Sequence, residues 1–496
     1  MDKIHHKYLL PNYIPTILFT SICIIIFFQH LCVPVAGASP HVYTPTETIF
    51  LYCGSSENIT SQDGTRTWIG DIKSEYVQSQ NNASTPAKAS TQPSGGGDKT
   101  PYMWARLSRS QFSYTFRLTP GQKFIRLYFY DTVYQNLDRS KAFFSVTAGN
   151  FTLLRNFSTS LAADDSGLDT ILKEFCVNVQ ENQNLNIIFS PSQEYNDSYA
   201  FINGIEIVSM PTDLYYTTVR GETEFPFVGQ APGVQFSLSN SNALEMVYRV
   251  NVGGNYISAG DDTGMYRTWS DDVSYLTEAR PSALPVNLTL QPTFSRIHNY
   301  SAPVVVYQTA RTMGTNATEN EIYRLTWEFP VDSTFTYLVR LHFCEFQPEI
   351  TVTGNRIFEI YIANQTAEKR ADVIGWGGGS GVPVYMDYVV TMGSKANQKK
   401  QNLSIALHPA PAYMTNYSDA ILNGVEIFKV DSSGSLAGPN PDPQTTPTTV
   451  APPTSGSSFS KRRMLTLSLG IAAGVVGIIH LSHKRPRKKF NITYVC

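Results

Sequence analysis

Pairs of neighbouring aspartates are the first residues in this sequence that could do chemistry. They stand at Asp164-Asp165, Asp261-Asp262 and Asp271-Asp272. A glycosidase needs two carboxylates that face each other across a sugar, about 5 to 9.5 Å apart. Adjacent side chains on a strand or turn point to different sides, so no such pair forms that site by itself. We therefore expect these aspartates to cap turns and loops.

A glycine-rich run at residues 375–381 looks like a phosphate-binding loop at first sight. A phosphate loop needs Lys-Ser or Lys-Thr after its glycines, and neither follows here. We expect a flexible loop that presents Trp376. The sequence also has no Gly-x-Ser-x-Gly elbow, no His-Glu-x-x-His and no paired Cys-x-x-Cys, so it predicts neither a nucleophile nor a zinc site.

Aromatic side chains are the remaining groups that could bind a ligand, because rings stack on sugars and anchor peptides. Tyr128, Tyr130 and Tyr134 lie on and just after one predicted strand, and Trp376 lies in the glycine-rich run. We take these four as candidate ligand-binding residues, with packing in a β-rich core as the open alternative for each. His342 sits in an apolar strand, and we expect a core residue there. The sequence offers no candidate for catalysis, for a metal or for a cofactor.

The elements that would position these residues occur twice along the chain. Residues 65–68 (Thr-Arg-Thr-Trp) return as residues 266–269 (Tyr-Arg-Thr-Trp), and residues 201–207 return as residues 421–427 with the shared motif Asn-Gly-x-Glu-Ile. Trp68 and Trp269 occupy equivalent positions in the two copies, which favours a shared structural role. The pattern indicates two copies of one domain in tandem.

The predicted fold class is all-β. Short runs of aromatic, β-branched and polar residues are separated by Gly, Pro, Asn and Asp about every ten residues. Two antiparallel β-sandwiches are the simplest architecture for the two copies. We place them at residues 39–211 and 241–430, joined by a connector at residues 212–240 that is too apolar for a free linker and should be structured.

The two ends of the chain predict export and a membrane anchor. Residues 1–38 have basic residues, a short apolar run and a small-residue cleavage pattern, which is typical of a signal peptide; a transmembrane helix is the alternative. Residues 464–481 would span roughly 27 Å as a helix, enough to cross a bilayer. Basic residues are more numerous after this segment, which predicts a cytoplasmic tail at residues 482–496. Residues 431–460 carry six prolines and predict an extended stalk.

Glycosylation motifs agree with an exported chain. Eleven Asn-x-Ser/Thr sequons lie between the two apolar segments, which suits a heavily glycosylated surface. The acceptors are Asn58, Asn82, Asn150, Asn156, Asn196, Asn287, Asn299, Asn316, Asn364, Asn402 and Asn416.

Few cysteines lie in the same region, and the net charge is close to zero. Cys53 and Cys176 could form a disulfide within the first copy and leave Cys344 as a buried free thiol, but the sequence leaves the connectivity open. A formal net charge of −2 gives no polyanion-binding surface, so nucleic acid is excluded as a partner.

Six stretches of the two copies carry a resemblance to a known family. They are residues 101–103, 123–130 and 203–211 of the first copy, and residues 261–265, 337–345 and 421–429 of the second copy. From about residue 47 to residue 441 the chain resembles the ectodomain of plant malectin-like receptor kinases of the FERONIA type. The resemblance implies two malectin-like β-sandwiches, residence in the plasma membrane with an extracellular ectodomain, and no cofactor.

The resemblance also implies partners. They are a secreted basic peptide of the rapid-alkalinisation-factor class, a GPI-anchored co-receptor, and pectin or another wall polysaccharide. Dimers with a second copy or with full-length receptor kinases fit the Gly470-x-x-x-Gly474 spacing of the predicted membrane helix. The animal lectin malectin has adjacent aromatics after its equivalent of the strand at residues 343–345. The second copy has Gln347-Pro348 there and the first has only Tyr134 nearby, so we do not expect a malectin-style disaccharide site, especially in the second copy.

The family further implies a cytoplasmic kinase, and here the chain departs from the pattern. The fifteen residues after Leu481 contain no Gly-rich loop, no His-Arg-Asp and no Asp-Phe-Gly, so we expect no phosphoryl transfer and no enzyme. The favoured function is a kinase-less receptor-like protein that binds the peptide or the co-receptor and acts as a decoy or co-receptor. The alternatives are a membrane tether that binds wall carbohydrate, or a truncated product of a receptor kinase gene.

Overall fold

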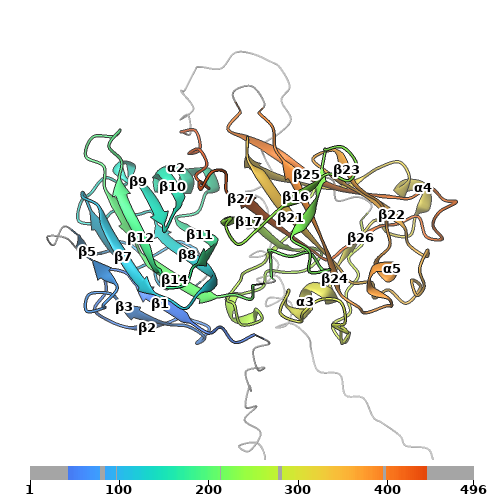
Figure 1. Cartoon of the computed structure of the whole chain (residues 1–496), viewed down its shortest axis with the longest axis horizontal. Helices are drawn as coiled ribbons and strands as arrows, with labels where there is room; N and C mark the ends of the chain where they lie inside the picture. The colour runs from blue at the N-terminus through green and yellow to red at the C-terminus, as the bar shows by residue number, and fades with distance from the viewer. Residues whose placement is uncertain are drawn as a thin grey trace, which may run out of the picture. The chain divides into compact units, whose positions relative to one another are not determined.

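The computed structural model describes residues 43–78, 84–95, 98–212, 214–277, 282–394 and 398–443. All of them lie in one compact unit, Met1–Gln444. The predicted signal peptide, membrane segment, cytoplasmic tail and most of the stalk lie outside the described residues. Within the described ranges, no helix is both long enough and apolar enough to span a membrane. Strands dominate and helices are short (Figure 1), which confirms a mostly β fold.

One thirteen-stranded sheet runs through both copies of the repeat. Its order is β16-β15-β24-β21-β27-β17-β11-β8-β14-β1-β3-β2, with β18 paired to β17. The first half (residues 43–211) contributes β1 (Thr48–Tyr52), β2 (Ile59–Thr60), β3 (Thr67–Gly70), β8 (Gly121–Tyr130), β11 (Thr170–Val179) and β14 (Gly204–Ser209). The second half (residues 214–430) contributes β15 (Glu224–Val228), β16 (Gln235–Ser237), β17 (Leu244–Asn251), β18 (Ser270–Asp271), β21 (Thr336–Phe343), β24 (Val384–Thr391) and β27 (Gly424–Val430).

Each half closes its own core with further sheets. In the first half these are β10-β9-β12-β7-β4 and β13-β6-β5; in the second half they are β20-β25-β22-β23 and β19-β26. The first-half bounds are β4 (Val77–Gln78), β5 (Thr85–Lys88), β6 (Trp104–Ser108), β7 (Phe112–Arg117), β9 (Phe143–Ala148), β10 (Phe151–Ser158), β12 (Asn184–Pro191) and β13 (Ala200–Ile202). The second-half bounds are β19 (Arg311–Thr312), β20 (Leu325–Asp332), β22 (Phe358–Ile362), β23 (Gln365–Ala371), β25 (Lys400–Pro409) and β26 (Ile421–Leu422).

The helices of the described residues are short. They are α2 (Thr159–Ser166), α3 (Val304–Gln308), α4 (Ala317–Asn320) and α5 (Val373–Gly377), with 3-10 turns η2 (Arg139–Lys141) and η3 (Ala259–Asp261).

The two halves meet through backbone pairing as well as side chains. Strand β11 of the first half pairs antiparallel with β17 of the second, in the register Glu174↔Met246 and Cys176↔Leu244. The connector adds β15, which pairs parallel with β24. The sandwiches therefore share one continuous sheet, which the predicted division into two separate sandwiches did not include.

Burial along the strands follows from this arrangement. Strand β9 alternates half-buried and buried residues, because only one of its faces packs on the first-half core. Strand β8 is buried at nearly every position, because both of its faces are covered. Ile125 faces the first-half core, whereas its neighbour Phe124 faces an apolar cluster between the halves.

That cluster, here called the junction core, fixes the connector. It contains Phe124, Cys176, Val208, Met210, Leu214, Tyr215, Tyr216, Phe225, Leu238, Leu244, Met265, Leu338, Val389, Phe428 and Val430. Full burial of each large apolar side chain stabilises by about 1.5–3 kcal/mol. The cluster draws residues from the first half, from the connector segment that begins the second half, and from the later strands of the second half, so it stabilises all of them together.

The first part of the predicted stalk is folded rather than extended. Residues 432–443, here called the C-terminal arm, return from β27 to the first half, where they lie beside β10 (Figure 1). The backbone N–H of Leu436 donates to Thr152 O at 2.9 Å, and the Thr152 N–H donates to Gly434 O at 2.9 Å. The Leu436 side chain is fully buried in the first-half core. Asn440 Nδ2 donates to Asn156 O at 2.6 Å.

Candidate functional site

The three tyrosines predicted to bind a ligand are buried in the first half. Tyr128 Oη donates to Glu206 Oε2 at 2.7 Å, and Tyr130 Oη lies 2.9 Å from Thr91 Oγ1. Tyr134 is fully buried and donates to the Tyr130 carbonyl oxygen at 3.1 Å. Each hydroxyl has an internal partner, as a buried phenol requires. We therefore replace the predicted ligand-binding role of these rings with a structural one.

Trp376 also packs inward, and the prediction of a flexible loop around it was wrong. The residue lies in α5, where Asp372 Oδ1 accepts the Gly375 N–H at 2.9 Å as an N-cap. Gly378 ends the helix at φ 86°, a left-handed conformation that favours glycine. The Trp376 ring lies 5.4 Å from the Phe343 ring and packs on the second-half core.

The aspartate pairs divide between turn caps and ion pairs. Asp271 Oδ1 accepts the Val273 N–H at 3.0 Å and caps a turn, as predicted. Its buried neighbour Asp272 instead accepts Arg311 Nε at 2.6 Å and Trp327 Nε1 at 2.9 Å. Asp165 lines a cavity together with Glu328, and its carboxylate is held in an ion pair with Lys400 Nζ at 3.1 Å. Among the described residues, no group of three or more His, Cys, Asp or Glu could hold a metal ion.

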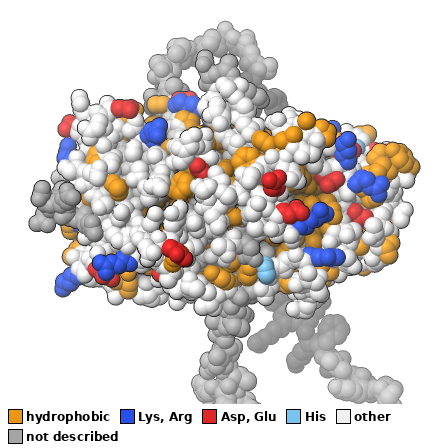
Figure 2. Space-filling view, in the orientation of Figure 1, with side chains coloured by type: hydrophobic (Ala, Val, Ile, Leu, Met, Phe, Trp, Pro, Cys, Tyr) orange, Lys and Arg blue, Asp and Glu red, His pale blue; other side chains and the backbone are white. Residues whose placement is uncertain are grey.

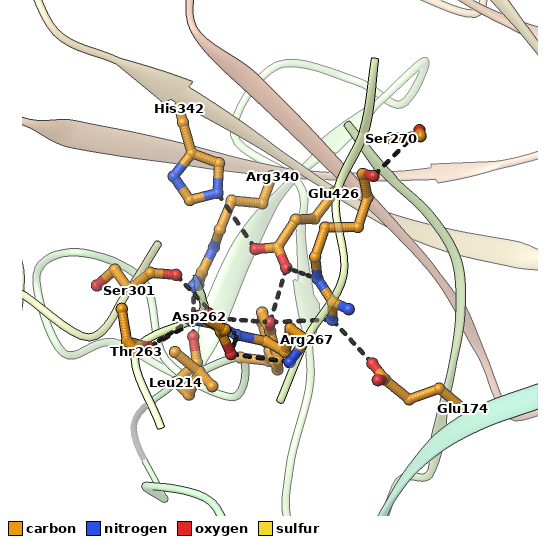
Figure 3. Close-up of polar contacts among 12 residues, drawn as sticks. Glu174, Leu214, Asp262, Thr263, Arg267, Ser270, Ser301, Arg340, His342 and Glu426 are labelled. Carbon is orange, nitrogen blue, oxygen red and sulfur yellow. Dashed lines mark hydrogen bonds and ion pairs between the residues drawn. The ribbon is translucent and has the colours of Figure 1, made fainter. Parts of the chain in front are cut away.

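Buried charged side chains form a network where the two halves meet (Figure 3). Arg126 Nε lies 2.5 Å from Glu174 Oε2, and Glu174 Oε1 lies 2.8 Å from Arg249 Nη2. Arg249 Nε lies 2.7 Å from Glu426 Oε1, so the ion pairs pass from the first half into the second. We call this the junction network; its further members are Arg66, Tyr128, Glu206, Tyr215, Asp262, Arg267, Arg340, His342 and Asp387.

Strand register explains why these charges meet. Arg126 on β8 lies directly opposite Glu174 on β11 and Glu206 on β14. Arg249 on β17 lies opposite Glu426 on β27. Opposite residues in an antiparallel pair have adjacent side chains, so each arginine has a carboxylate within reach. The network is therefore a consequence of the pairing of β8, β11, β17 and β27 in one sheet.

The repeat contained a signal for this network that the sequence analysis missed. Arg126 and Arg340 occupy equivalent positions in the two copies, inside the apolar runs of β8 and β21. Glu206 and Glu426 are the acids of the repeated Asn-Gly-x-Glu-Ile motif. A charge that recurs at one position within an apolar strand predicts a buried partner, because an isolated buried charge is very unfavourable.

The electrostatics of the network favour fixed charges. Burial alone would raise the pKa of Glu174, but Arg126 and Arg249 lower it to about 2. Burial lowers the pKa of His342, so its imidazole is neutral, and Glu426 lies 3.2 Å from its Nε2. Tyr307 Oη lies 3.0 Å from Nδ1, so the histidine is a satisfied core residue, as predicted. All these groups are buried, so the network can fix the halves but cannot reach a substrate.

An acidic surface lies beside the network, and we call its residues, Asp63, Asp98, Tyr256 and Asp261, the junction surface; all are exposed except Asp98, which is half-buried and lies 3.9 Å from Arg66 Nη2. Tyr256 is 62% exposed, and burial of the rest of its ring together with the nearby aspartates raises its pKa. Partial burial would raise the pKa of Asp63, but hydrogen bonds from Ser61 and Thr65 lower it, so this carboxylate stays ionised.

Both halves contribute to the junction surface. A Cβ added at Gly260, in η3 of the second half, would lie 2.8 Å from Asp63 Oδ2 of the first half. The loop that carries Asp261 therefore approaches the Asp63 side chain closely. Elsewhere, Figure 2 shows acidic and basic side chains scattered over one face of the molecule, without one large patch of a single sign. The junction surface could not be predicted from the sequence because its aspartates come from separate loops.

A cavity of about 600 Å³, here called the second-half cavity, lies at the loop end of the second half. Arg356 on its wall donates to Glu345 Oε2 at 2.5 Å, Gln347 Oε1 at 2.6 Å and Asp419 Oδ2 at 2.8 Å. Burial raises the pKa of both Glu345 and Asp419 despite this arginine. The remaining lining includes Glu349, Tyr417 and two sequon asparagines, Asn316 and Asn416.

Most sequon asparagines lie where an attached glycan has room. Two are half-buried, Asn156 and Asn287, and Asn82 lies outside the described residues. The exposed ones are Asn58, Asn150, Asn196, Asn299, Asn316, Asn364, Asn402 and Asn416.

The cysteine pairing proposed from the sequence is absent. Cys53, Cys176 and Cys344 are all free and buried. Cys53 belongs to the first-half core, whereas Cys176 belongs to the junction core on the other face of the long sheet. Because the sheet separates them, the two sulfurs cannot form a bond without rearranging the strands.

Comparison with known proteins finds similarity to the malectin-like domain and to receptor-like protein kinases. A model of the malectin-like domain matches residues 51–430. The receptor-like protein kinase FERONIA of Arabidopsis thaliana is 46% identical over 444 residues, which cover 88% of this chain and 48% of that protein. The Arabidopsis receptor-like protein kinase ANXUR1 is 33% identical over 87% of this chain and 49% of that protein. The chain thus spans about half the length of these relatives.

Solved structures agree with the sequence comparison. A crystal structure of the plant receptor-like kinase FER superposes with a TM-score of 0.72 at 44% identity, covering 80% of this chain and 100% of that chain. The ANX1 ectodomain of Arabidopsis thaliana gives a TM-score of 0.74 at 33% identity, with the same coverage. A further crystal structure is that of the plant peptide RALF23 in complex with FER and LLG2. It superposes with a TM-score of 0.72 at 45% identity and covers 81% of this chain and 100% of that chain.

Proposed function

The chain belongs to the malectin-like family, and from that membership we propose a cell-surface receptor-like protein that binds a secreted basic peptide of the rapid-alkalinisation-factor class together with a GPI-anchored co-receptor. The matched region is a non-catalytic binding domain. The relative of known structure in complex with a peptide and LLG2 supports both kinds of partner. The plasma membrane, with the described residues outside the cell, is the proposed location.

One observation of this structure favours a basic peptide: the junction surface gathers carboxylates from both halves around an exposed tyrosine. Asp63 and Asp261 are exposed, and Tyr256 stands between the two halves with most of its ring accessible. Acidic groups raise the association rate of a cationic partner, and a tyrosine anchors a peptide at low entropic cost. We therefore propose the junction surface, in place of the Trp376 loop, as the peptide contact.

The junction network supports this proposal by holding the surface in one shape. Arg267 donates to Asp262 Oδ1 at 3.0 Å and to the Tyr300 carbonyl oxygen at 2.8 Å, which fixes the loop that carries Asp261. A site built in advance loses less entropy on binding. We propose that the protein retains the peptide at this surface as a decoy or co-receptor.

Calorimetry with basic peptides of this class tests the proposal. A secreted fragment of residues 39–443 should bind at least one of them, alone or with a GPI-anchored co-receptor. The double variant Asp63→Asn/Asp261→Asn should weaken binding about ten-fold, because it removes two charges and keeps the carbonyl acceptors of both side chains. Tyr256→Ala should weaken binding by at least a similar factor. The matched control is Glu181→Gln, which removes an exposed charge of the first half that is not part of the junction surface. This variant should bind as the wild type does.

Two results would overturn the proposal. Equal affinity of wild type and the double variant would remove the junction surface as the contact. Binding to pectin fragments but to no peptide would support a wall-carbohydrate tether instead.

A further inference from the structure

We propose that the second-half cavity is filled by the protein's own N-linked glycan, attached at Asn416, and is therefore not open to a diffusing ligand. The inference rests on the proposed extracellular location, since the sugar is added only during export. It concerns a different surface from the proposed peptide contact.

The position of Asn416 is fixed at the wall of this cavity. The Asn416 N–H donates to Gly354 O at 3.3 Å, and the Tyr417 N–H donates to Asn355 O at 2.8 Å. Thr415 Oγ1 donates to Asn355 O at 3.1 Å and accepts the Ile357 N–H at 2.9 Å. The sequon Asn416-Tyr417-Ser418 is thus held on neighbouring backbone, and all three of its residues line the cavity.

The lining suits an N-acetylhexosamine. Tyr417, next to the attachment point, is 41% exposed and offers a ring face for the apolar face of a sugar. Gln347 and Glu349 supply an amide and a carboxylate for the sugar's hydroxyl and acetamide groups, and Gln347 Nε2 lies 3.2 Å from Glu349 Oε1. The volume of about 600 Å³ lies in the range of roughly 300–1,000 Å³ that small-molecule sites occupy.

Asn416 fits better than the second sequon at the cavity. The Asn316 side-chain oxygen accepts the Glu319 N–H at 3.4 Å as the N-cap of α4. No aromatic residue follows Asn316, since its neighbour is Ala317. Asn416 is followed at once by the exposed Tyr417, so a sugar on Asn416 begins next to its stacking partner.

The attachment itself uses ordinary donor chemistry. The Asn416 amide nitrogen attacks the anomeric carbon of an oligosaccharide carried on a lipid diphosphate. The new nitrogen–carbon bond replaces the carbon–oxygen bond to the diphosphate, which leaves with its electron pair, and the amide gives up one proton.

Glycosidase protection on the folded protein tests this inference. The full chain is produced in secreting animal cells and treated, native and denatured, with a peptide N-glycosidase, followed by glycopeptide mass spectrometry. Asn196, an exposed sequon that does not line the second-half cavity, is the internal control. We expect release from native Asn416 at least ten-fold slower than from Asn196, and equal rates after denaturation.

Variants add a second readout. Asn416→Gln and Ser418→Ala both remove the sequon and should lower the melting temperature by about 2 °C or more. Ser418→Thr keeps the sequon and should melt as the wild type does, as should Asn196→Gln. Equal release from the two native sites, protection at Asn316 in place of Asn416, or an unoccupied Asn416 beside an occupied Asn196 would overturn the inference and leave the peptide proposal standing. If no sequon carries a glycan, the extracellular location fails as well.

Discussion

At the scale of single residues, Glu174 is the link between the halves. Its carboxylate contacts Arg126 of the first half and Arg249 of the second, and its side chain is only 2% exposed. The sequence indicated neither contact, because they depend on which strands pair between the copies. It did indicate the chemistry: arginines and glutamates recur at fixed positions in apolar strands, and charges in such places need partners.

Neutralising Glu174 should weaken the fold in a pH-dependent way. Glu174→Gln leaves two buried guanidinium groups without their shared counter-charge, which should cost about 3–5 kcal/mol of unfolding free energy at pH 7. The pKa of Glu174 is about 2 in the folded protein, against 4.5 ordinarily. The unfolded chain therefore binds more protons between these values, and the stabilisation is complete above about pH 4.5 and lost as the pH falls toward 2.

Denaturant unfolding of wild type and variant from pH 7 to pH 2.5 checks this. The difference in unfolding free energy between wild type and Glu174→Gln should decrease as the pH falls. Asp197→Asn, which breaks an exposed ion pair with Arg109, is the control and should change stability by at most about 1 kcal/mol. A difference for Glu174→Gln that stays constant with pH would contradict the assigned charge.

At the scale of elements, short local sequence patterns predicted the strands well but predicted the C-terminal arm and helix α5 poorly. Strands β9 and β12 alternate buried and less buried residues as their sequences do. The C-terminal arm was predicted as part of a stalk because its Pro, Ser and Gly content is typical of linkers. Leu436 is the one large apolar side chain of residues 431–443, and its site in the first-half core lies far away in sequence. The five-residue helix α5 was missed because one turn has too little periodicity to detect.

The C-terminal arm should contribute to stability through Leu436. Leu436→Ala leaves a cavity in the first-half core and should lower the unfolding free energy by about 2–5 kcal/mol. Leu288→Ala, at a position 65% exposed, removes the same atoms from the surface and should have little effect. Chemical denaturation of the two variants measures these changes in unfolding free energy. Equally small changes for both variants would mean that Leu436 does not pack in the first-half core in solution.

At the scale of the whole molecule, the sequence indicated that one domain is duplicated, but it did not indicate that the two copies share a sheet. Repeated motifs indicated two β-rich copies, but periodicity within a strand does not show which strand edges meet across copies. One signal was available: residues 124–130 of β8 are apolar or aromatic except for Arg126, which is typical of a strand covered on both faces. Its second face packs on the junction core, and the sheet continues through β11 into β17.

The shared sheet predicts that the halves unfold together. Separating them would break the β11–β17 pairing, expose the junction core and leave buried charges unpaired. Differential scanning calorimetry of residues 39–443 should therefore show one transition whose calorimetric and van't Hoff enthalpies agree. Two separate transitions would contradict the continuous sheet.

The central claim is that a basic peptide binds at the junction surface between the halves, and site-directed photo-crosslinking tests it most directly. A photoreactive phenylalanine analogue replaces Tyr256 in one sample and Tyr413, which is 87% exposed on a loop of the second half, in the other. With a basic peptide of the rapid-alkalinisation-factor class, we predict a crosslink from position 256 that an excess of unlabelled peptide abolishes, and none from position 413. Crosslinking from position 413 with none from position 256 would contradict the account.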